Sequence, residues 1–383
     1  MKVLNCNYEL LIPNIVSSDN CYLFDEAGKR YVDFESGVWC ASLGHNNKQI
    51  NKSIVRQMEI ISHTGYRYTT KIVDEAAGRV LDLLGFTDGK CVFLSSGSEA
   101  VEFGVQLAKK IMGKTHFLCL DNYFLSSYGI SAARSKEEWI SLDLSKYSGD
   151  AARFLENVPF EKIGAFVFEP GNASGTASLP PKELIKVIES KVKENGGVIV
   201  TDEVTTGIGR TGKWFGFEHY DMHPDIVAIG KGVGNGYPVS VIALTKPISK
   251  AAEKLGFKYA QSHQNDPLGC AVIKEVISVI EDNDIISKTA SMGAAFKSGL
   301  KLLSATHRCI KDVRGVGLMC IIELHHSEAV CLSKIHSELL DAGYIVGINV
   351  HASLLRFYPP LTIEEAEIKN IVEALDAILR RMS

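Results

Sequence analysis

Residues 198–244 read VIVTDEVTTGIGRTGKWFGFEHYDMHPDIVAIGKGVGNGYPVSVIAL, and this segment decides the class of fold. It holds three short apolar runs, VIVTD (198–202), IVAIG (226–230) and VSVIAL (239–244). Similar runs occur upstream as HFLCL (116–120) and AFVFE (165–169). Runs of this length with little polar alternation predict strands that are buried on both faces. Because parallel sheets are covered on both faces, the runs predict an α/β protein with a largely parallel sheet.

Amphipathic stretches between these runs predict the helices that cover the sheet. The clearest are Glu99–Lys110 and Pro181–Glu194. The second opens with a proline pair, which suits the first turn of a helix, and it ends before Gly196-Gly197.

The length suggests two or three domains, and the pattern changes near residue 285. We predict a large domain over 46–284 and a smaller α+β domain over 285–383. The segment 1–45 contains CYLFDEAGKRYVDFESG, which predicts a hairpin turning at Glu26-Ala27-Gly28. We expect this N-terminal segment to pack with the small domain.

Composition and charge exclude several classes of function. The chain has 383 residues, and 41 basic and 45 acidic side chains give it a net charge of −4. A charge so near zero argues against a nucleic-acid or membrane partner, and no apolar run approaches the roughly 20 residues that span a bilayer. The N-terminus lacks the apolar core of a secretory signal. Nine scattered cysteines without a C-x-x-C pair favour reduced thiols in a cytoplasmic protein over disulfides or a metal site.

The glycine-rich stretch 207–212 imitates two nucleotide-binding motifs. Gly207, Gly209 and Gly212 match G-x-G-x-x-G, and the same stretch nearly matches G-x-x-x-x-G-K-[ST]. In the second motif Trp214 stands where a hydroxyl must hold magnesium. In the first, no helical pattern follows to point an N-terminus at a pyrophosphate. We therefore interpret the stretch as a sharp loop whose glycines permit positive φ, and not as an NAD or nucleotide site.

Two consecutive predicted strands end in side chains that carry chemistry. Asp202 ends one run and Lys231 follows the next, so a carboxylate and an amine reach the edge of the sheet where open α/β sheets bind ligands. Ser96-Gly97-Ser98 precedes an amphipathic helix, and a helix N-terminus binds anions. Taken singly, these are ordinary features: a solvated lysine, a loop aspartate and a helix cap. Together they match pyridoxal phosphate, which needs a lysine for an imine, an acid for its ring nitrogen and an N-terminus for its phosphate.

The chain resembles the class III aminotransferases, a fold-type I group of pyridoxal-phosphate enzymes. Motifs that carry the resemblance run from YLFDEAGKRYVDF (22–34) to LRFYPPLTI (355–363), and the most specific is the unbroken stretch 202–244. The resemblance implies a large cofactor-binding domain with a mostly parallel sheet and helices on its faces, plus a smaller α+β domain. It also implies that Lys231 holds the cofactor as an imine and that Asp202 pairs with the pyridine nitrogen, 29 residues apart as in the family.

The resemblance implies further contacts to the cofactor. Gly97 and Ser98 would donate hydrogen bonds to the phosphate. Val204 would pack on one face of the pyridine ring, and Tyr123, in DNYFLSS, would stack on the other. Family members bring a threonine from the neighbouring subunit to the phosphate, and the matching segment here reads SHQNDP. Ser262 is therefore expected in that place, in a homodimer with shared active sites.

Two residues are expected to meet the substrate. Trp39, in GVWC, resembles a pocket element of the ω-amino-acid and amine aminotransferase branch, although core packing explains it equally well. Arg356 matches the arginine that binds the carboxylate of the amino or keto acid, and guanidinium–carboxylate pairing is bidentate. The alternative for Arg356 is a structural ion pair with a carboxylate of the protein.

Three positions depart from the family pattern. Ser126 stands where acetylornithine-type enzymes have an arginine for the substrate carboxylate. Ser174 replaces a glutamate that ornithine- and GABA-type enzymes use to hold an arginine aside, and it cannot form that salt bridge. Thr205 replaces a glutamine that hydrogen-bonds the O3′ atom of the cofactor, so the role of this position is open.

These features predict an aminotransferase with a ping-pong mechanism. The donor would be a primary amine or ω-amino compound, and the acceptor a 2-oxo acid such as pyruvate or 2-oxoglutarate. A racemase, epimerase or aminomutase on the same scaffold is the alternative, and a non-enzymatic relative is a third hypothesis. The sequence does not identify the donor, because pocket shape depends on loops and on the partner subunit.

Overall fold

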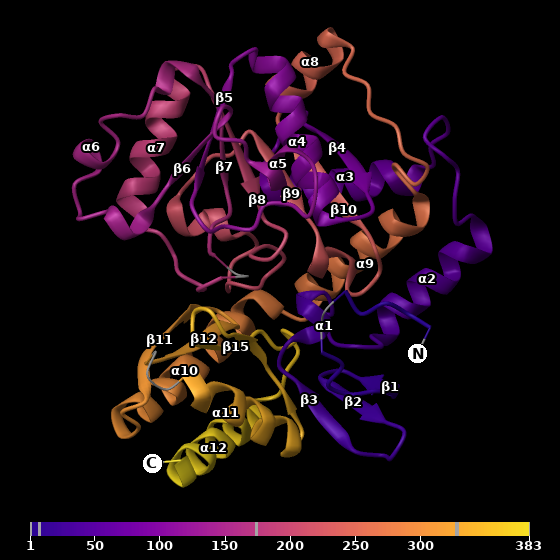
Figure 1. Ribbon diagram of the computed structural model, residues 1–383. Helices are drawn as coiled ribbons and strands as arrows, with labels where there is room; N and C mark the ends of the chain where they lie inside the picture. Colours follow the sequence, from indigo (N-terminus) through magenta and orange to yellow (C-terminus); the bar gives the residue numbers. More distant parts are fainter. Residues whose placement is uncertain (1, 7–8, 173–174, 326–328, 383) are drawn as a thin grey trace.

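The chain folds into two lobes (Figure 1), as a computed structural model that describes residues 2–6, 9–172, 175–325 and 329–382. The first lobe is built on a seven-stranded sheet in the order β4-β10-β9-β8-β7-β5-β6. Its strands are β4 (Lys90–Leu94), β5 (His116–Leu120), β6 (Trp139–Leu142), β7 (Ile163–Phe168), β8 (Val198–Asp202), β9 (Ile226–Ile229) and β10 (Ser240–Leu244). β10 is antiparallel to both neighbours, and the other pairings are parallel. The predicted α/β fold with a mostly parallel sheet is therefore confirmed.

The sheet is buried on both faces, as its apolar strands predict. In β8, Ile199 packs in one apolar cluster with Ile185 and Ile188 of α7 (Lys182–Glu194). The flanking Val198 and Val200 belong to a second cluster, on the face covered by α4 (Gly97–Met112). The remaining helices of this lobe are α2 (Lys48–Ile60), α3 (Lys71–Leu84), α5 (Ile130–Ala133), α6 (Ala151–Phe154), α8 (Lys246–Leu255) and α9 (Pro267–Asp282), with short 3-10 helices at Leu144–Lys146, Phe160–Lys162, Gly216–Tyr220 and Lys231–Gly234.

The second lobe combines the C-terminal quarter of the chain with the N-terminal segment. An antiparallel sheet in the order β11-β12-β15-β14 contains β11 (Ile310–Val316), β12 (Met319–Leu324), β14 (Gly347–Asn349) and β15 (Leu354–Phe357). Its helices are α10 (Ile285–Thr306), α11 (Ala329–Asp341) and α12 (Glu365–Met382). A second sheet joins β1 (Ile15–Asp19), β2 (Tyr22–Asp25) and β3 (Arg30–Asp33) to β13 (Tyr344–Ile345), with α1 (Ser36–Trp39) following β3.

The N-terminal hairpin is confirmed, because β2 and β3 pair antiparallel around the expected turn. β3 also pairs in parallel with β13, so residues from the two ends of the chain share one sheet. The domain boundaries after residues 45 and 284 stay predictions. Among the described residues, no helix combines the length and the apolar composition needed to cross a bilayer.

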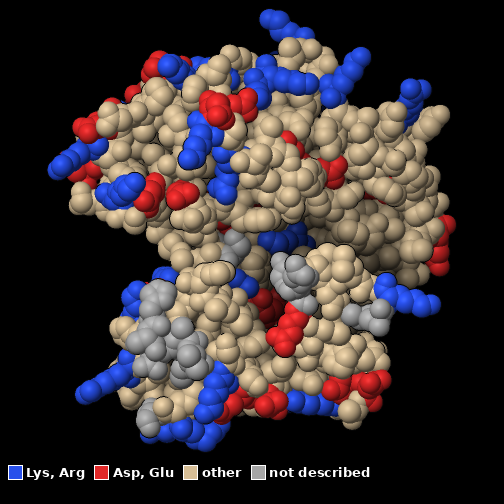
Figure 2. Space-filling view, viewed as in Figure 1, with Lys and Arg blue, Asp and Glu red and all other residues tan. Residues whose placement is uncertain are grey.

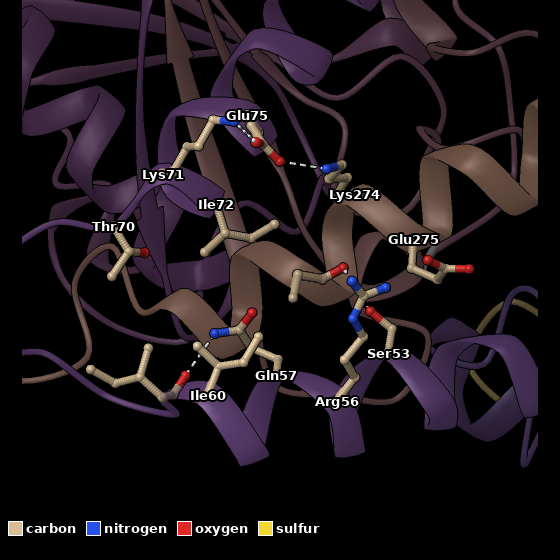
Figure 3. A pocket seen from close by; sticks show the side chains of 12 residues that line it. Ser53, Arg56, Gln57, Ile60, Thr70, Lys71, Ile72, Glu75, Lys274 and Glu275 are labelled. Atoms are coloured by element: carbon tan, nitrogen blue, oxygen red, sulfur yellow. Dashed lines mark hydrogen bonds and ion pairs between the residues drawn. The ribbon is translucent and has the colours of Figure 1, made fainter.

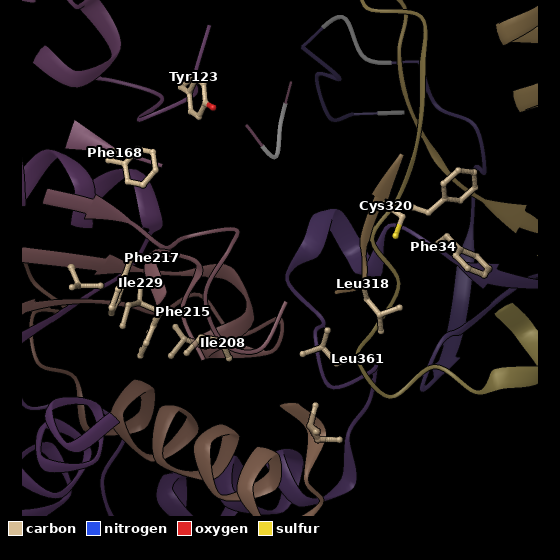
Figure 4. Packing of buried hydrophobic residues seen from close by; sticks show 14 of the residues in the cluster. Phe34, Tyr123, Phe168, Ile208, Phe215, Phe217, Ile229, Leu318, Cys320 and Leu361 are labelled. Carbon is tan, nitrogen blue, oxygen red and sulfur yellow. The ribbon is translucent and has the colours of Figure 1, made fainter. Parts of the chain in front are cut away.

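The glycine-rich stretch is a loop, as interpreted from the sequence. Residues 204–211 form turns and no helix opens at Gly212. Arg210 of this loop is 2% exposed, and its Nη1 donates to the carbonyl oxygens of Leu318 at 3.0 Å and Pro359 at 2.5 Å. The hydrogen bonds of Arg210 therefore link the first lobe to the second. Figure 4 shows apolar packing around this contact, with Ile208, Phe215, Phe217 and Ile229 on one side and Phe34, Leu318, Cys320 and Leu361 on the other.

Candidate active site

The candidate site is a cavity of about 800 Å³ between the lobes. Figure 2 shows the hollow there, with basic and acidic atoms inside it. Asp202 ends β8 and Lys231 follows the adjacent parallel strand β9, so both side chains enter the cavity from the same edge of the sheet. The first lobe also contributes Ser96, Gly97, Ser98, Phe124, Leu125, Ser127, Glu169, Val204 and Thr205, and the second contributes Glu35, Val38, Trp39, Ile348, Asn349, Val350, His351 and Arg356.

The carboxylate and the amine at the base of the cavity alter each other's protonation. Burial raises the pKa of Asp202 to about 7, against the opposing effects of the Val204 N–H, 3.0 Å from Asp202 Oδ1, and of Lys231. Burial likewise lowers the pKa of Lys231, although the charge of Asp202 raises it. Nζ of Lys231 donates to Thr205 Oγ1 at 2.7 Å. The lysine is thus shifted toward its neutral, nucleophilic form.

The backbone at Lys231 is strained, with a φ of +45°. Side chains other than glycine seldom adopt this left-handed conformation, and such residues concentrate at functional sites. Gly230 makes the turn possible, since a Cβ there would lie 3.0 Å from the Cα of Gly97. The close approach brings the lysine next to the start of α4.

The N-terminus of α4 faces the same cavity. Ser96 is the N-cap, and its Oγ accepts a hydrogen bond from Glu99 N at 3.2 Å. Ser98 Oγ accepts from Ser127 N at 3.0 Å, so the loop after β5 is bound to the first turn of the helix. The N–H groups of a first turn lack partners within the helix, and the helix dipole is positive there. This end of the cavity is therefore suited to bind an anion.

The two residues expected on the faces of a pyridine ring do not both reach the cavity. Val204 lines it, in close contact with Gly97, where a Cβ would lie 2.5 Å from Val204 Cγ1. Tyr123 is absent from the cavity lining among the described residues: it is 3% exposed, and its hydroxyl donates to the Ser178 carbonyl at 3.5 Å. Tyr123 belongs to an apolar cluster of the core (Figure 4), and its expected contact with the pyridine ring stays a prediction. The next residue, Phe124, lines the cavity and is 49% exposed.

Both expected substrate residues lie in the cavity. The Trp39 ring is 7% exposed, with Lys231 Nζ 4.5 Å and Arg356 Cζ 4.7 Å from its centroid. Arg356 also forms an ion pair with Glu35, Nε to Oε1 at 3.2 Å and Nη2 to Oε2 at 3.3 Å. Both alternatives for Arg356 therefore apply in part, since the arginine lines the cavity and is paired with a carboxylate.

Two further positions singled out in the sequence, Ser126 and Ser262, do not line the cavity of their own chain. Ser262 is exposed in a turn before α9, where a second subunit would have to bring it to the phosphate. Ser126 is buried, and its Oγ donates to the Tyr128 carbonyl at 2.8 Å. Ser174 lies outside the described residues. His263 does not line the cavity either and pairs with Asp266 at 2.9 Å.

Sequence reasoning missed three residues of the site. Glu35 gave no signal beyond an acid after an apolar strand, and its partner is 321 residues away. Phe124 follows Tyr123 in DNYFLSS and was given no role, yet it lines the cavity. Thr205 was seen only as a lost glutamine, whereas its hydroxyl accepts the hydrogen bond of the Lys231 amine.

Together these groups form a site for a ligand that carries an aldehyde, a phosphate and a cationic ring. A buried lysine poised as a nucleophile can bind an aldehyde, and a helix N-terminus can hold a phosphate. Asp202 accepts one hydrogen bond among the described residues, from Val204 N, so its buried carboxylate is suited to a cationic ring N–H. Pyridoxal phosphate carries an aldehyde, a phosphate and a protonatable pyridine, and the residues present fit it.

Comparison with known proteins agrees with this assignment. The family model described as "Aminotransferase class-III" matches residues 4–126 and 130–379. The acetylornithine aminotransferase of Caldanaerobacter subterraneus subsp. tengcongensis is 30% identical over 379 residues, which cover 95% of this chain and 94% of that protein. The solved acetylornithine aminotransferase of Elizabethkingia anophelis is 25% identical, with a TM-score of 0.87 over 98% of this chain and 96% of that one.

A third match shows the fold alone. The amine transaminase of an uncultivated Pseudomonas species, solved in its PLP-bound form, has a TM-score of 0.88 at 22% identity, over 100% of this chain and 97% of its own. The chain belongs to the class III aminotransferases. It is a pyridoxal-phosphate-dependent transaminase.

Proposed function

We propose that this transaminase moves the amino group of a primary amine or ω-amino compound to a 2-oxo acid, such as pyruvate or 2-oxoglutarate, in a ping-pong reaction. One observation carries the proposal. Lys231 Nζ and Arg356 Cζ lie over the same Trp39 ring, 4.5 and 4.7 Å from its centroid. A reactive amine and a carboxylate-binding cation are therefore close enough for one small keto acid to contact both.

Different residues of the cavity bind different parts of the cofactor in this proposal. The first turn of α4, at Gly97 and Ser98, binds the phosphate, and Asp202 keeps the pyridine nitrogen protonated. The bound cofactor supplies an electron sink for the carbanion that forms on the substrate. Lys231 Nζ would bind the aldehyde carbon of the cofactor and, once freed by the substrate amine, would take a proton from the substrate carbon and give it to the cofactor carbon. Val204 and Phe124, which both line the cavity, would lie beside the ring.

The lining of the cavity supports a donor that does not need the carboxylate contact made by the acetylornithine-type arginine. The sequence relatives are named for acetylornithine and for [LysW]-aminoadipate semialdehyde, both acted on by those proteins. Here Ser126 stands where the acetylornithine-type arginine is expected, and it is buried away from the cavity. The rim instead carries Val38, Phe124 and Val350, which are 63%, 49% and 55% exposed. Such a rim favours an apolar amine or the amine-bearing end of an ω-amino compound.

A second copy of the chain is the proposed partner. Val55, Met58 and Ile60 of α2 have 56%, 58% and 70% of their surface exposed, and exposed apolar side chains gathered on one helix suggest an interface. Ile60 lines a groove of about 390 Å³ between α2, α3 and α9, where Figure 3 shows Glu75 paired with Lys71 and Lys274. Tyr66 and Tyr68 extend the exposed surface. A homodimer with Ser262 contributed across the interface agrees with this surface.

A cytoplasmic location is proposed on the state of the thiols. The described cysteines form no disulfide, and burial raises the pKa of Cys21 and of Cys320, to about 11 and about 12. Buried, protonated thiols of this kind suit a reducing compartment.

The proposed reaction is tested by its first half. Holoenzyme mixed with an amine donor alone is expected to release about one equivalent of ketone or aldehyde per site and to lose its lysine-linked absorbance, which a 2-oxo acid then restores. A panel of amines, ω-amino acids and acetylornithine, each with pyruvate or 2-oxoglutarate, identifies the pair. Recovery of inverted or isomerised amino acid alone would replace the proposal with a racemase or aminomutase.

The role of Lys231 has its own test. Lys231→Ala is expected to abolish turnover and to leave no cofactor that borohydride can fix to the protein. Lys246→Ala, which removes a surface lysine at the start of α8, is the matched control and should keep both properties. Normal turnover of Lys231→Ala would overturn the assignment.

A further inference from the structure

The carboxylate-binding cation of the cavity is already paired inside the protein. Glu35 contacts Arg356 through both of its oxygens, at 3.2 and 3.3 Å, and the two side chains are only 15% and 13% exposed. The rings of Trp39 and Tyr358 flank the guanidinium, with centroids 4.7 and 5.7 Å from Cζ. Glu35 also accepts from Trp39 Nε1 at 3.4 Å. Both charged groups line the cavity, so this pair belongs to the substrate surface and not to the core.

The fold leaves a specific space for the Glu35 carboxylate. Arg356 on β15 pairs directly with Gly347 on β14, so the two residues share one face of the sheet. Glu35 lies where the side chain of residue 347 would be, because a Cβ on Gly347 would overlap the Glu35 carboxylate. The φ of Gly347 is not in the left-handed region, so the backbone itself does not require glycine. What requires the glycine is the carboxylate beside Arg356.

Glu35 occupies the Nε and Nη2 edge of the Arg356 guanidinium and offsets its positive charge. A substrate carboxylate can therefore use that edge only by displacing Glu35, and at the other edge it meets an arginine whose charge is already offset. An amine without a carboxylate at that position has no such competitor. The two half-reactions of the proposed function thus meet different forms of the same cavity.

Resting on that proposed function, we propose that Glu35 is a specificity-determining residue, seated by Gly347, that competes with substrate carboxylates for Arg356. With Glu35 in place the cavity accepts amine donors that lack an adjacent carboxylate. A 2-oxo acid binds when its carboxylate replaces that of Glu35. α-Amino acids are disfavoured as donors because they must make the same replacement.

Two variants weaken the pair between residue 35 and Arg356 by different means. Glu35→Gln removes the charge and keeps the shape, whereas Gly347→Ala keeps every charge and takes the space. Each holoenzyme is expected to bind propionate, a carboxylate without an amine, about tenfold more tightly by calorimetry. Each should also lower the KM for the 2-oxo acid and raise kcat/KM for L-alanine as donor by a similar factor, with the KM of the simple amine unchanged.

Glu323→Gln is the matched control, since Glu323 forms an equally buried pair with Arg314 on β11 and β12 and does not line the cavity. It should bind propionate as the wild type does. Unchanged propionate affinity in both test variants, or equal shifts in the KM of amine and keto acid, would overturn the role of Glu35.

The propionate titration separates this inference from the proposed function. If the holoenzyme only racemises amino acids while Glu35→Gln and Gly347→Ala still tighten propionate binding, the proposed function fails and the role of Glu35 stands. If transamination is observed and propionate affinity does not change, the reverse holds.

Discussion

Two adjacent carboxylates, Asp202 and Glu203, are both buried but differ in their hydrogen bonds. Glu203 accepts from Gly216 N, Phe217 N and Thr206 Oγ1, each at 2.8 Å, which fixes the turn before the 3-10 helix. Asp202 accepts from Val204 N alone among the described residues. A buried carboxylate that accepts three hydrogen bonds from the protein has a structural role. A carboxylate in the cavity that accepts only one can still accept hydrogen bonds from a ligand. This difference, and not burial, distinguishes the functional acid from its neighbour.

The protonation of Asp202 should make the affinity for the cofactor depend on pH. Burial raises the pKa of Asp202 to about 7, so in the cofactor-free protein the carboxyl is charged above that pH and takes a proton below it. Since a charged carboxylate holds the protonated pyridine, the affinity for pyridoxal phosphate should fall as pH is lowered through 7. At about pH 8, Asp202→Asn should bind roughly tenfold more weakly, and at about pH 6 the two proteins should differ less.

Fluorescence titration of both proteins between these pH values checks this. The difference between the two curves reports the loss of the Asp202 charge, including the effect of that charge on the pKa of Lys231. Parallel curves would show that another group sets the pH dependence.

At the scale of elements, the sequence predicted strands where apolar runs are continuous. β5 and β8 match their predicted bounds, and β7, β9 and β10 differ by one or two residues at the ends. β4 and β6 were not predicted, because β4 has a polar, partly exposed start and β6 is an edge strand of four residues. These two strands take their conformation from the sheet they join more than from their own pattern.

The loop after β5 shows a second limit. Resemblance to the family predicts a ring contact for Tyr123, and the structure adds the next residue, Phe124, to the cavity lining. A loop has no regular periodicity, so its sequence does not show which of two adjacent side chains faces a cavity. The strand ends that carry Asp202 and Lys231 were predicted because strand direction and register fix them.

A prediction for α4 tests the close packing at its N-terminus. In Gly97→Ala the new methyl would lie 2.5 Å from Val204 Cγ1, and a valine side chain has few alternative rotamers. We expect a loss of about 1–3 kcal/mol in the free energy of unfolding, together with weaker binding of pyridoxal phosphate. Gly78→Ala in the middle of α3, where a Cβ meets nothing within 4 Å, should instead stabilise the protein by about 1 kcal/mol.

Thermal unfolding with and without cofactor measures both variants. A Gly97→Ala protein with unchanged stability and cofactor affinity would show that α4 can shift away from Val204, and that the contact does not define the phosphate end of the cavity.

At the scale of the molecule, the contacts that assemble the site are long-range. Arg210 reaches carbonyls 108 and 149 residues further on, and Glu35 reaches Arg356 across 321 residues. The sequence contains the participants but not these pairings, because the Arg210 contacts depend on how the lobes meet and the Glu35 pair depends on how the N-terminal segment packs in the second lobe. The glycine-rich stretch that imitates a nucleotide site owes its shape to this contact, since its loop carries Arg210 into the second lobe.

The last prediction concerns the proposed dimer and uses two exposed aliphatic side chains that differ only in their place. Ile60 at the end of α2 is 70% exposed beside the groove, and Leu302 on α10 of the other lobe is 71% exposed. If α2 faces a second copy, Ile60→Asp buries a charge at the interface, so the protein should sediment as a monomer and lose at least about tenfold in kcat/KM as the partner's share of the site is withdrawn. Leu302→Asp should stay dimeric and active. Sedimentation velocity and the transamination assay read out both properties, and a wild-type chain that is monomeric and fully active would exclude a shared site.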